Sequence, residues 1–342
     1  MAFPARVCSS GIMVKGIVKK ALIGSGALRW LARRRGKSAA ILMYHSVLEE
    51  PSRVTDSLGG IALSTRAFQS QMEMLARDFR PIDLEQAGRF VTEEGELPER
   101  SVVITFDDGY TDNYEIAMPI LNRVGVPATF YVTVDCIERR TLPWPSRLRF
   151  AFRTTQKKSW VDSTCKSWNL SSAEDRETAY LSACDQVCQM AGVTLEAEVA
   201  RAERELEAML PHSTAQLMMT WDQVKGLEQK GHIVGSHTMT HPNMAFLKLD
   251  DLRRELTVSK QTMESHLGEP VRHFSYPCPA LFPNWTQQTT EESKRAGYQT
   301  AVTTNDGVVR KRDNPLELKR VRPTRTVDGL RWNLESAFAG SV

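Results

Sequence analysis

The chain has 342 residues, of which 41% are hydrophobic and 25% charged, as expected for a globular protein with room for one large α/β domain. Its formal net charge is +3, and its six cysteines form no CxxC pair, which argues against a compact disulfide framework. No repeat is present, and no uninterrupted apolar run approaches the roughly 18 residues that span a bilayer.

Basic charge is concentrated at the N-terminus. Residues 1–40 contain nine basic residues and no acidic one, whereas the rest of the chain has 35 basic and 41 acidic residues. We expect residues 1–39 to be a basic arm with an amphipathic helix between Gly11 and Leu31, which could contact anionic lipid. A solvated, poorly ordered terminus is an equal alternative. Lysines interrupt the apolar run that a secretory signal needs, so we expect a protein that is cytoplasmic or peripherally membrane-associated.

Short β-type runs then alternate with helical patterns, which favours a mostly parallel sheet or barrel with helices outside. Strands are predicted at residues 41–44, 101–106, 128–134, 232–235, 271–276 and 299–303. Helices are predicted around residues 68–76, 112–124, 220–231 and 250–267. Two of these helices should begin at capping boxes, formed by Asp112 with Glu115 and by Thr220 with Gln223.

Residues 139–217 break this alternation. They are rich in charge, and they contain one helix predicted to begin at a cap formed by Ser171 and Glu174 and another predicted over residues 195–210. The segment is too long for a structureless loop and falls between two strands. We therefore expect a helical insertion in a domain of residues 40–342, and this insertion should overhang one end of the sheet.

Two short segments carry the residues that could perform chemistry. Asp107 and Asp108 end one predicted strand, and His237 and His241 follow another. A spacing of four residues places both imidazoles on one face of a helical turn, where they can share a cation. A carboxylate from a neighbouring strand end would complete the three protein ligands of an open metal site. Successive side chains of a strand diverge, so one aspartate can bind the metal while the other faces its water.

Such a site would acidify a bound water and polarise a carbonyl, and the free carboxylate would take the proton. Two histidines and one carboxylate suit Zn²⁺, and Ni²⁺, Co²⁺ or Mn²⁺ could also occupy the site. Asp-Asp-Gly alone is typical of a turn, and His-x-x-x-His alone of a polar helix face. Their occurrence together, each at a strand end, favours a catalytic metal centre.

Six segments match motifs of one known family: ILMYHSV, TFDDGYTDN, GVPATFYV, TWDQVKGLEQKGHIVGSHTMTHPNM, FSYP and AGYQTAVTT. Over about residues 40–325 the chain resembles the NodB-type polysaccharide deacetylases, carbohydrate esterase family 4. The resemblance implies a distorted (β/α) barrel, with Asp107 as general base and Asp108, His237 and His241 as metal ligands. The implied reaction removes N-acetyl groups from a carbohydrate, either a polysaccharide or a lipid-linked sugar, with a metal-bound water as the nucleophile.

The third motif departs from the family pattern Arg-x-Pro-Tyr-Gly. This chain has Ser275, Tyr276, Pro277, Cys278 and Pro279 there, so Ser275 replaces the arginine that braces the base in relatives. The resemblance places Cys278 where a backbone N–H faces the oxyanion, with Tyr276 and Pro277 as substrate contacts. A backbone donor does not depend on its side chain, so this role can survive. Pro279 has no N–H and stiffens the loop.

The late Leu-x-His motif that supplies the general acid in many relatives is missing, because no histidine follows His273. Tyr44 and His45 instead match a pair on the first strand of relatives that resemble the poly-N-acetylglucosamine deacetylases. We expect His45 to protonate the leaving amine. A half-buried histidine that braces the barrel mouth is the alternative. His273 is expected on the surface or at an element end, and Asp306 could assist the acid.

The sequence leaves other functions open. The same barrel could perform O-deacetylation or hydrolyse a small non-sugar amide, and a catalytically silent carbohydrate-binding protein could keep the metal as a structural element. The basic arm could bind nucleic acid, although it contains no recognition motif. Three tryptophans in or near the insertion could stack on sugar rings, although core packing is the commoner role: Trp144, Trp160 and Trp168.

Overall fold

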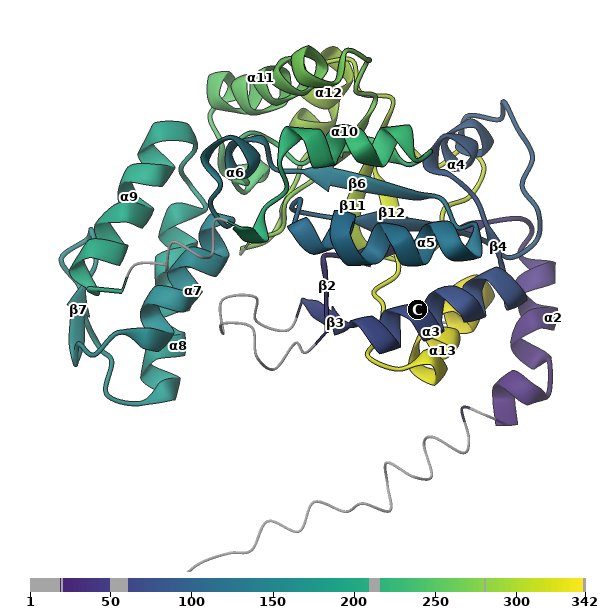
Figure 1. Ribbon diagram of the computed structural model, residues 1–342, viewed down its shortest axis with the longest axis horizontal. Coiled ribbons are helices and arrows are strands. Elements are labelled where there is room, and N and C mark those ends of the chain that lie inside the picture. Colours follow the sequence, from purple (N-terminus) through teal and green to yellow (C-terminus); the bar gives the residue numbers. More distant parts are fainter. Residues whose placement is uncertain (1–18, 20, 50–60, 209–215, 280, 341–342) are drawn as a thin grey trace, which may run out of the picture.

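The computed structural model describes residues 19, 21–49, 61–208, 216–279 and 281–340. A nearly closed parallel sheet lies at its centre (Figure 1). Seven strands of the described residues follow one another around this sheet, and β4 (Arg80–Pro81) pairs with β5 at its side. In spatial order they are β1 (Ala39–Tyr44), β5 (Ser101–Phe106), β6 (Ala128–Val132), β9 (Ile233–Ser236), β10 (His273–Ser275), β11 (Thr300–Asp306) and β12 (Leu318–Arg320).

The residue after β12 closes the ring against β1. The N–H of Val321 donates to the carbonyl O of Ile41 at 2.7 Å, and its carbonyl O accepts from the N–H of Met43 at 3.2 Å. The fold is therefore a distorted (β/α) barrel, as the family resemblance implied. Strand β12 was absent from the predicted strands, yet its position beside β1 brings the C-terminal part of the chain to the barrel mouth.

Helices connect the strands and cover the outside of the barrel (Figure 1). The larger ones are α3 (Thr65–Asp78), α4 (Leu84–Val91), α5 (Met118–Val124), α6 (Val134–Arg139), α10 (Trp221–Gln229), α11 (Leu249–Leu267), α12 (Gln287–Arg295) and α13 (Val327–Ala339). Shorter elements are β2 (Ser46–Leu48), β3 (Ala62–Ser64), the π-helix η3 (Asn113–Ala117) and the 3₁₀ turn η5 (Met244–Phe246). The predicted capping box of Thr220 and Gln223 begins α10.

The other predicted capping box is wrong. The carboxylate of Asp112 does not cap the helix that follows it but accepts hydrogen bonds from Ser46 Oγ at 2.6 Å and from the N–H of Val47 at 2.9 Å. The carboxylate of Asp112 therefore binds two donors on β2 instead of the backbone N–H groups of its own helix. Asp112 therefore joins β2, which follows β1, to the helix that follows β5, a contact that no local pattern could indicate.

Side chains of the strands alternate between the barrel interior and the helical shell, as the period of a strand requires. Val103 of β5 packs in one cluster with Ile41 of β1 and Leu318 of β12, whereas Ile104 packs in the cluster that includes α3, α5 and α11. Asp107 lies four positions after Val103 and therefore points inward, toward the mouth of the barrel. The strand pattern thus directs the first of the two aspartates into the interior.

A separate helical unit lies at one side of the barrel, between α6 and α10 in the chain (Figure 1, left). It consists of α7 (Trp144–Thr154), the hairpin of β7 (Ser159–Val161) and β8 (Ser167–Asn169), α8 (Ala173–Val187) and α9 (Gly192–Glu205). The predicted cap lies one residue later than expected, because Ser172 and Asp175 form the capping box of α8. Trp144 and Trp160 are buried in the core of this unit, as the packing alternative predicted, and the half-buried Trp168 packs against it.

Residues 11–18 and 20 of the predicted amphipathic helix lie outside the described residues, whereas residues 21–24 and 27–34 are helical, with a turn at Ser25 and Gly26 between them. Helix α2 (Ala27–Arg34) packs against α13 through the buried Leu28, while Trp30 is 55% exposed. No helix in the part of the chain that the structure describes is both long and apolar enough to cross a bilayer. Contact of the arm with a membrane surface stays a prediction.

Two histidines in the barrel wall are buried. His273, which was expected near the surface, is 3% exposed, and its Nδ1 lies 2.9 Å from Thr300 Oγ1. His273 is the first residue of β10, as the element-end alternative predicted, and the surface alternative was wrong because β10 lies between two neighbouring strands. Nδ1 of His232 accepts the N–H of Ala128 at 3.2 Å. Burial lowers the pKa of both imidazoles to about 4, so both are neutral in the folded protein at pH 7.

We expect these two histidines to make the fold less stable at mildly acidic pH. The unfolded chain binds their protons near pH 6.5 and the folded chain near pH 4. The free energy of unfolding should therefore decrease as the pH falls through this range, by about 1 kcal/mol per pH unit for each histidine. Urea unfolding at pH 7 and at pH 5 should show a smaller difference for His273→Gln than for the wild type. Equal differences would contradict the assignment.

Candidate active site and metal centre

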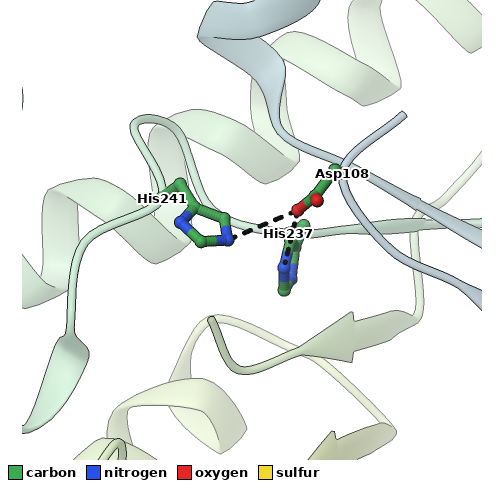
Figure 2. Close-up of side chains that lie close together, drawn as sticks. All are labelled: Asp108, His237 and His241. Atoms are coloured by element: carbon green, nitrogen blue, oxygen red, sulfur yellow. Dashed lines mark ion pairs between the residues drawn. The ribbon is translucent and has the colours of Figure 1, made fainter. Parts of the chain in front are cut away.

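Asp108, His237 and His241 converge at the barrel mouth (Figure 2). Oδ1 of Asp108 lies 3.5 Å from Nε2 of His237 and 3.3 Å from Nε2 of His241. One ligand atom of each residue lies within 4.8 Å of the other two, and all three residues are buried. The fold thus brings together the three predicted ligands, and the group could hold a divalent metal.

The hydrogen bonds around the three residues leave their ligand atoms available. Nδ1 of His237 lies 2.7 Å from the carbonyl O of Ser275, so its N–H donates there and the lone pair is on Nε2. Oδ1 of Asp108 is buried and accepts no hydrogen bond from the described residues. Burial opposes its ionisation, but the facing imidazoles, above all that of His241 at 3.3 Å, outweigh burial and lower the pKa of Asp108. A buried carboxylate facing two imidazoles fits a divalent cation.

The two histidines do not lie on a helical turn, so that part of the prediction is wrong. They lie in an irregular loop after β9, in which Thr238 and His241 have φ values of 69° and 59°. The N–H of His241 donates to Thr238 Oγ1, and Glu255 of α11 accepts the N–H groups of Met239 and Thr240, each at 2.9 Å. Two histidines four residues apart therefore face one point because a tight loop, held by these hydrogen bonds, brings them together.

A sharp turn separates the two aspartates. Asp108 has a φ of 79° and Gly109 a φ of 94°, in the left-handed region that favours glycine. A Cβ atom at Gly109 would lie 3.2 Å from side-chain atoms of both Val132 and Ile137, so the turn has no room for a larger residue. Asp107 follows the strand into the interior, and the turn points Asp108 at the histidines.

An arginine that the sequence analysis missed holds Asp107. Nη1 and Nη2 of Arg320 donate to the two carboxylate oxygens at 2.9 and 2.8 Å, and Ser275 Oγ donates at 3.3 Å. Asp107 is 2% exposed and Arg320 1%. Burial would raise the pKa of Asp107, but the charges of Arg320 and His237 outweigh it and hold the pKa below its usual value. Asp107 is therefore an ionised carboxylate outside the group of Asp108, His237 and His241, which we call the metal group because it could hold a cation.

Arg320 supplies from β12 the brace that the resemblance expected at the position of Ser275. Leu318 packs in the barrel interior, and Arg320 lies two positions later on the same face. The signal in the sequence was weak, because this strand is three residues long and has charged neighbours. A buried arginine in such a segment looks the same in sequence as an exposed one.

A cavity of about 300 Å³ lies over the metal group and Asp107. His45 at the end of β1 lines this cavity, and so do Tyr276 and Cys278 after β10. The hydroxyl of Tyr276 donates to the carbonyl O of Leu316 at 3.0 Å, which fixes the ring. Pro277 is buried, and Asp306 is exposed; neither is part of the lining formed by the described residues.

The helical unit α7 to α9 contacts the loop that carries the histidines. The indole N–H of Trp144 donates to the carbonyl O of His241 at 2.8 Å, and the N–H of Gly192 donates to Thr240 Oγ1 at 3.3 Å. The unit also forms one wall of the cavity, with Pro143, Pro145, Ser146, Arg149 and Tyr180. The insertion is therefore part of the site.

A parallel (β/α) barrel with two histidines and an aspartate at its mouth has the architecture of the NodB-type deacetylases. Comparison with known proteins supports this class. Residues 94–301 match the model of the polysaccharide deacetylase family, and the chain belongs to this family. Membership makes the protein a hydrolase that deacetylates a carbohydrate, and it implies an N-acetylated carbohydrate as the substrate.

Individual relatives are distant. The chain is 21% identical over 301 residues to YxkH of Bacillus subtilis, which is named as a polysaccharide deacetylase; the match covers 88% of this chain and 76% of YxkH. The deacetylase PplD of Streptococcus pyogenes, solved with acetate, superposes with a TM-score of 0.57 at 19% identity, covering 87% of this chain and 98% of PplD. IcaB from Ammonifex degensii superposes with a TM-score of 0.56 at 20% identity, covering 88% and 98%. These structures share the fold.

Proposed function

We propose that the protein removes N-acetyl groups from a polysaccharide or a lipid-linked sugar at a divalent metal held by Asp108, His237 and His241. The observation that carries this proposal is the buried Oδ1 of Asp108, which faces both imidazoles while a second carboxylate, Asp107, stays outside the group. A purely structural metal site has no need of this second carboxylate. Its presence therefore argues against a catalytically silent carbohydrate-binding protein.

The roles of the residues follow from their positions. A bound metal would acidify a water and polarise the acetyl carbonyl. Arg320 and Ser275 hold the carboxylate of Asp107 in place, where it would accept the proton of such a water. The backbone N–H of Cys278 donates to the developing oxyanion. His45, in the cavity lining, gives a proton to the leaving nitrogen, and acetate and a free sugar amine result.

The ligand set also bears on the identity of the metal. Two neutral imidazoles and one carboxylate are ligands that Zn²⁺ accepts in open catalytic sites. Burial lowers the pKa of His237 to about 4, so this imidazole is neutral and can bind metal at pH 7. We propose Zn²⁺, with Ni²⁺, Co²⁺ and Mn²⁺ as alternatives that share these ligands.

Acetate release by the purified chain tests the reaction and the metal together. We expect one equivalent of metal per chain, release of acetate from N-acetylglucosamine oligomers, and loss of that release to background after chelation, restored by Zn²⁺. Acetylated xylan and a small cyclic amide serve as substrates for the two rival reactions. Faster turnover of acetylated xylan or of the cyclic amide would replace N-deacetylation as the proposed reaction. Full activity in metal-free protein would refute the proposed role of the metal.

A further inference from the structure

We propose that the acetylated sugar bound in the cavity carries an oxyanion, either a phosphate or a carboxylate, and that Arg149 and Arg322 bind this group. The inference rests on the proposed deacetylase function and names the class of its substrate. Both arginines line the cavity over the metal group. They come from different parts of the chain, Arg149 from α7 of the helical unit and Arg322 from the segment after β12.

The charges of the cavity favour an anionic ligand. The described lining contains two carboxylates, Asp107 and Asp108, and the two arginines, Arg149 and Arg322. Asp107 is neutralised by the buried Arg320, and Asp108 would be neutralised by a divalent metal. The charges of the two arginines therefore remain in excess. A cleft lined by charges of one sign concentrates ligands of the opposite sign.

Arg149 is held in an orientation suited to an oxyanion. Its Nη2 donates to the hydroxyl O of Tyr180 at 3.2 Å, and its guanidinium carbon lies 4.7 Å from the centre of the Tyr180 ring. Its ion pair with Glu177 is long, at 3.9 Å, and Glu177 also pairs with Arg153 at 3.6 Å. The guanidinium is thus positioned by an aromatic ring while its charge is only weakly compensated. The adjacent N–H donors of a guanidinium match the paired oxygens of phosphate and carboxylate.

Arg322 supplies the second positive charge from the barrel. It lies two residues after Arg320, beyond the end of β12, and it lines the cavity over Asp107. Its contact with Asp306 is 3.9 Å long, and the two side chains are 58% and 54% exposed. A surface pair of this length holds its partners weakly, so Arg322 can turn toward a ligand in the cavity.

The test compares substrates that differ in charge. N-Acetylglucosamine 1-phosphate and N-acetylglucosamine 6-phosphate carry a phosphate, N-acetylmuramic acid carries a carboxylate, and N-acetylglucosamine is neutral. We expect kcat/KM for acetate release to be about tenfold or more higher for at least one anionic sugar than for the neutral one. Which anionic sugar is preferred distinguishes phosphate from carboxylate. A neutral sugar turned over as well as every anionic one would overturn the inference.

Variants assign the preference to the two arginines. Arg149→Gln and Arg322→Gln should each reduce the ratio of anionic to neutral kcat/KM, and the double variant should bring it close to one. Arg149→Lys keeps the charge and should retain part of the ratio. Arg153→Gln, on the same helix and also paired with Glu177, is the matched control and should keep the wild-type ratio at an unchanged Tm.

The outcomes separate this inference from the proposed function. A preference for anionic sugars that survives in the double variant would overturn the roles of Arg149 and Arg322 while leaving deacetylation intact. Acetate release from neutral oligomers with no preference for charged sugars would overturn the anionic substrate class and would also leave deacetylation intact. Absence of acetate from every sugar, charged or neutral, would overturn the proposed function itself and the inference with it.

Discussion

Asp107→Asn is expected to reduce acetate release by about 10³-fold while the protein keeps its metal. The amide has nearly the shape of the carboxylate and can still accept a hydrogen bond from Arg320, but it cannot take a proton. The metal group should persist because Asp107 lies outside it and its two oxygens bind Arg320. The measurements are kcat for acetate release and the metal content of the same preparation.

The matched control for this variant is Asp251→Asn, which removes a carboxylate from the surface of α11. It should keep wild-type turnover. Turnover of Asp107→Asn equal to that of the wild type would refute the assignment of Asp107 as the base. Loss of metal along with turnover would instead make Asp107 a ligand, which would require a different arrangement of the two aspartates.

Arg320→Gln is expected to reduce kcat by about 10- to 100-fold and to shift the acidic limb of the pH–rate profile to higher pH. The guanidinium favours the ionised form of Asp107 against the effect of burial. Without it, burial dominates and the pKa of Asp107 rises. Because the base must be unprotonated, activity should then disappear at a higher pH than in the wild type. Rates measured from pH 5 to pH 9 give this shift.

The same variant should also lose about 3 kcal/mol of stability, because it leaves a buried carboxylate without its partner. The double variant Asp107→Asn/Arg320→Gln removes both charges and should recover part of this loss in urea unfolding, but none of the activity. A merely structural role for Arg320 predicts lower stability with an unmoved pH profile. That result would show that Arg320 does not act through Asp107.

The proposed metal ligands and the proposed base could be read from the sequence because the pattern that suggests them is local. A pair of adjacent carboxylates and two histidines four positions apart are visible in a single sequence, and the alternation of strands and helices places both at the same edge of a parallel sheet. The reason given for the spacing was nevertheless wrong. His237 and His241 meet through a loop that Glu255 braces from α11, and that brace lies outside the local pattern.

The residues around these groups could not be predicted in the same way. Arg320 reaches Asp107 across 213 positions of the chain only because Val321 closes the barrel against β1. Trp144 supports the loop of His237 and His241 because the helical unit docks there, although its sequence context indicates only a core residue. In each case the two residues come into contact only because the sheet closes or because the insertion packs against the barrel.

The amino-acid sequence by itself determined the class of barrel, the four residues expected to act at its centre and the presence of a helical segment between two strands. These properties depend on residue type and on periods of a few positions, which the order of the residues contains directly. Only the tertiary structure decided which arginine keeps Asp107 ionised, what holds the loop of His237 and His241, and which side chains bring positive charge to the cavity. Such contacts join buried charges from distant segments, and their geometry exists only once the ring of strands has closed.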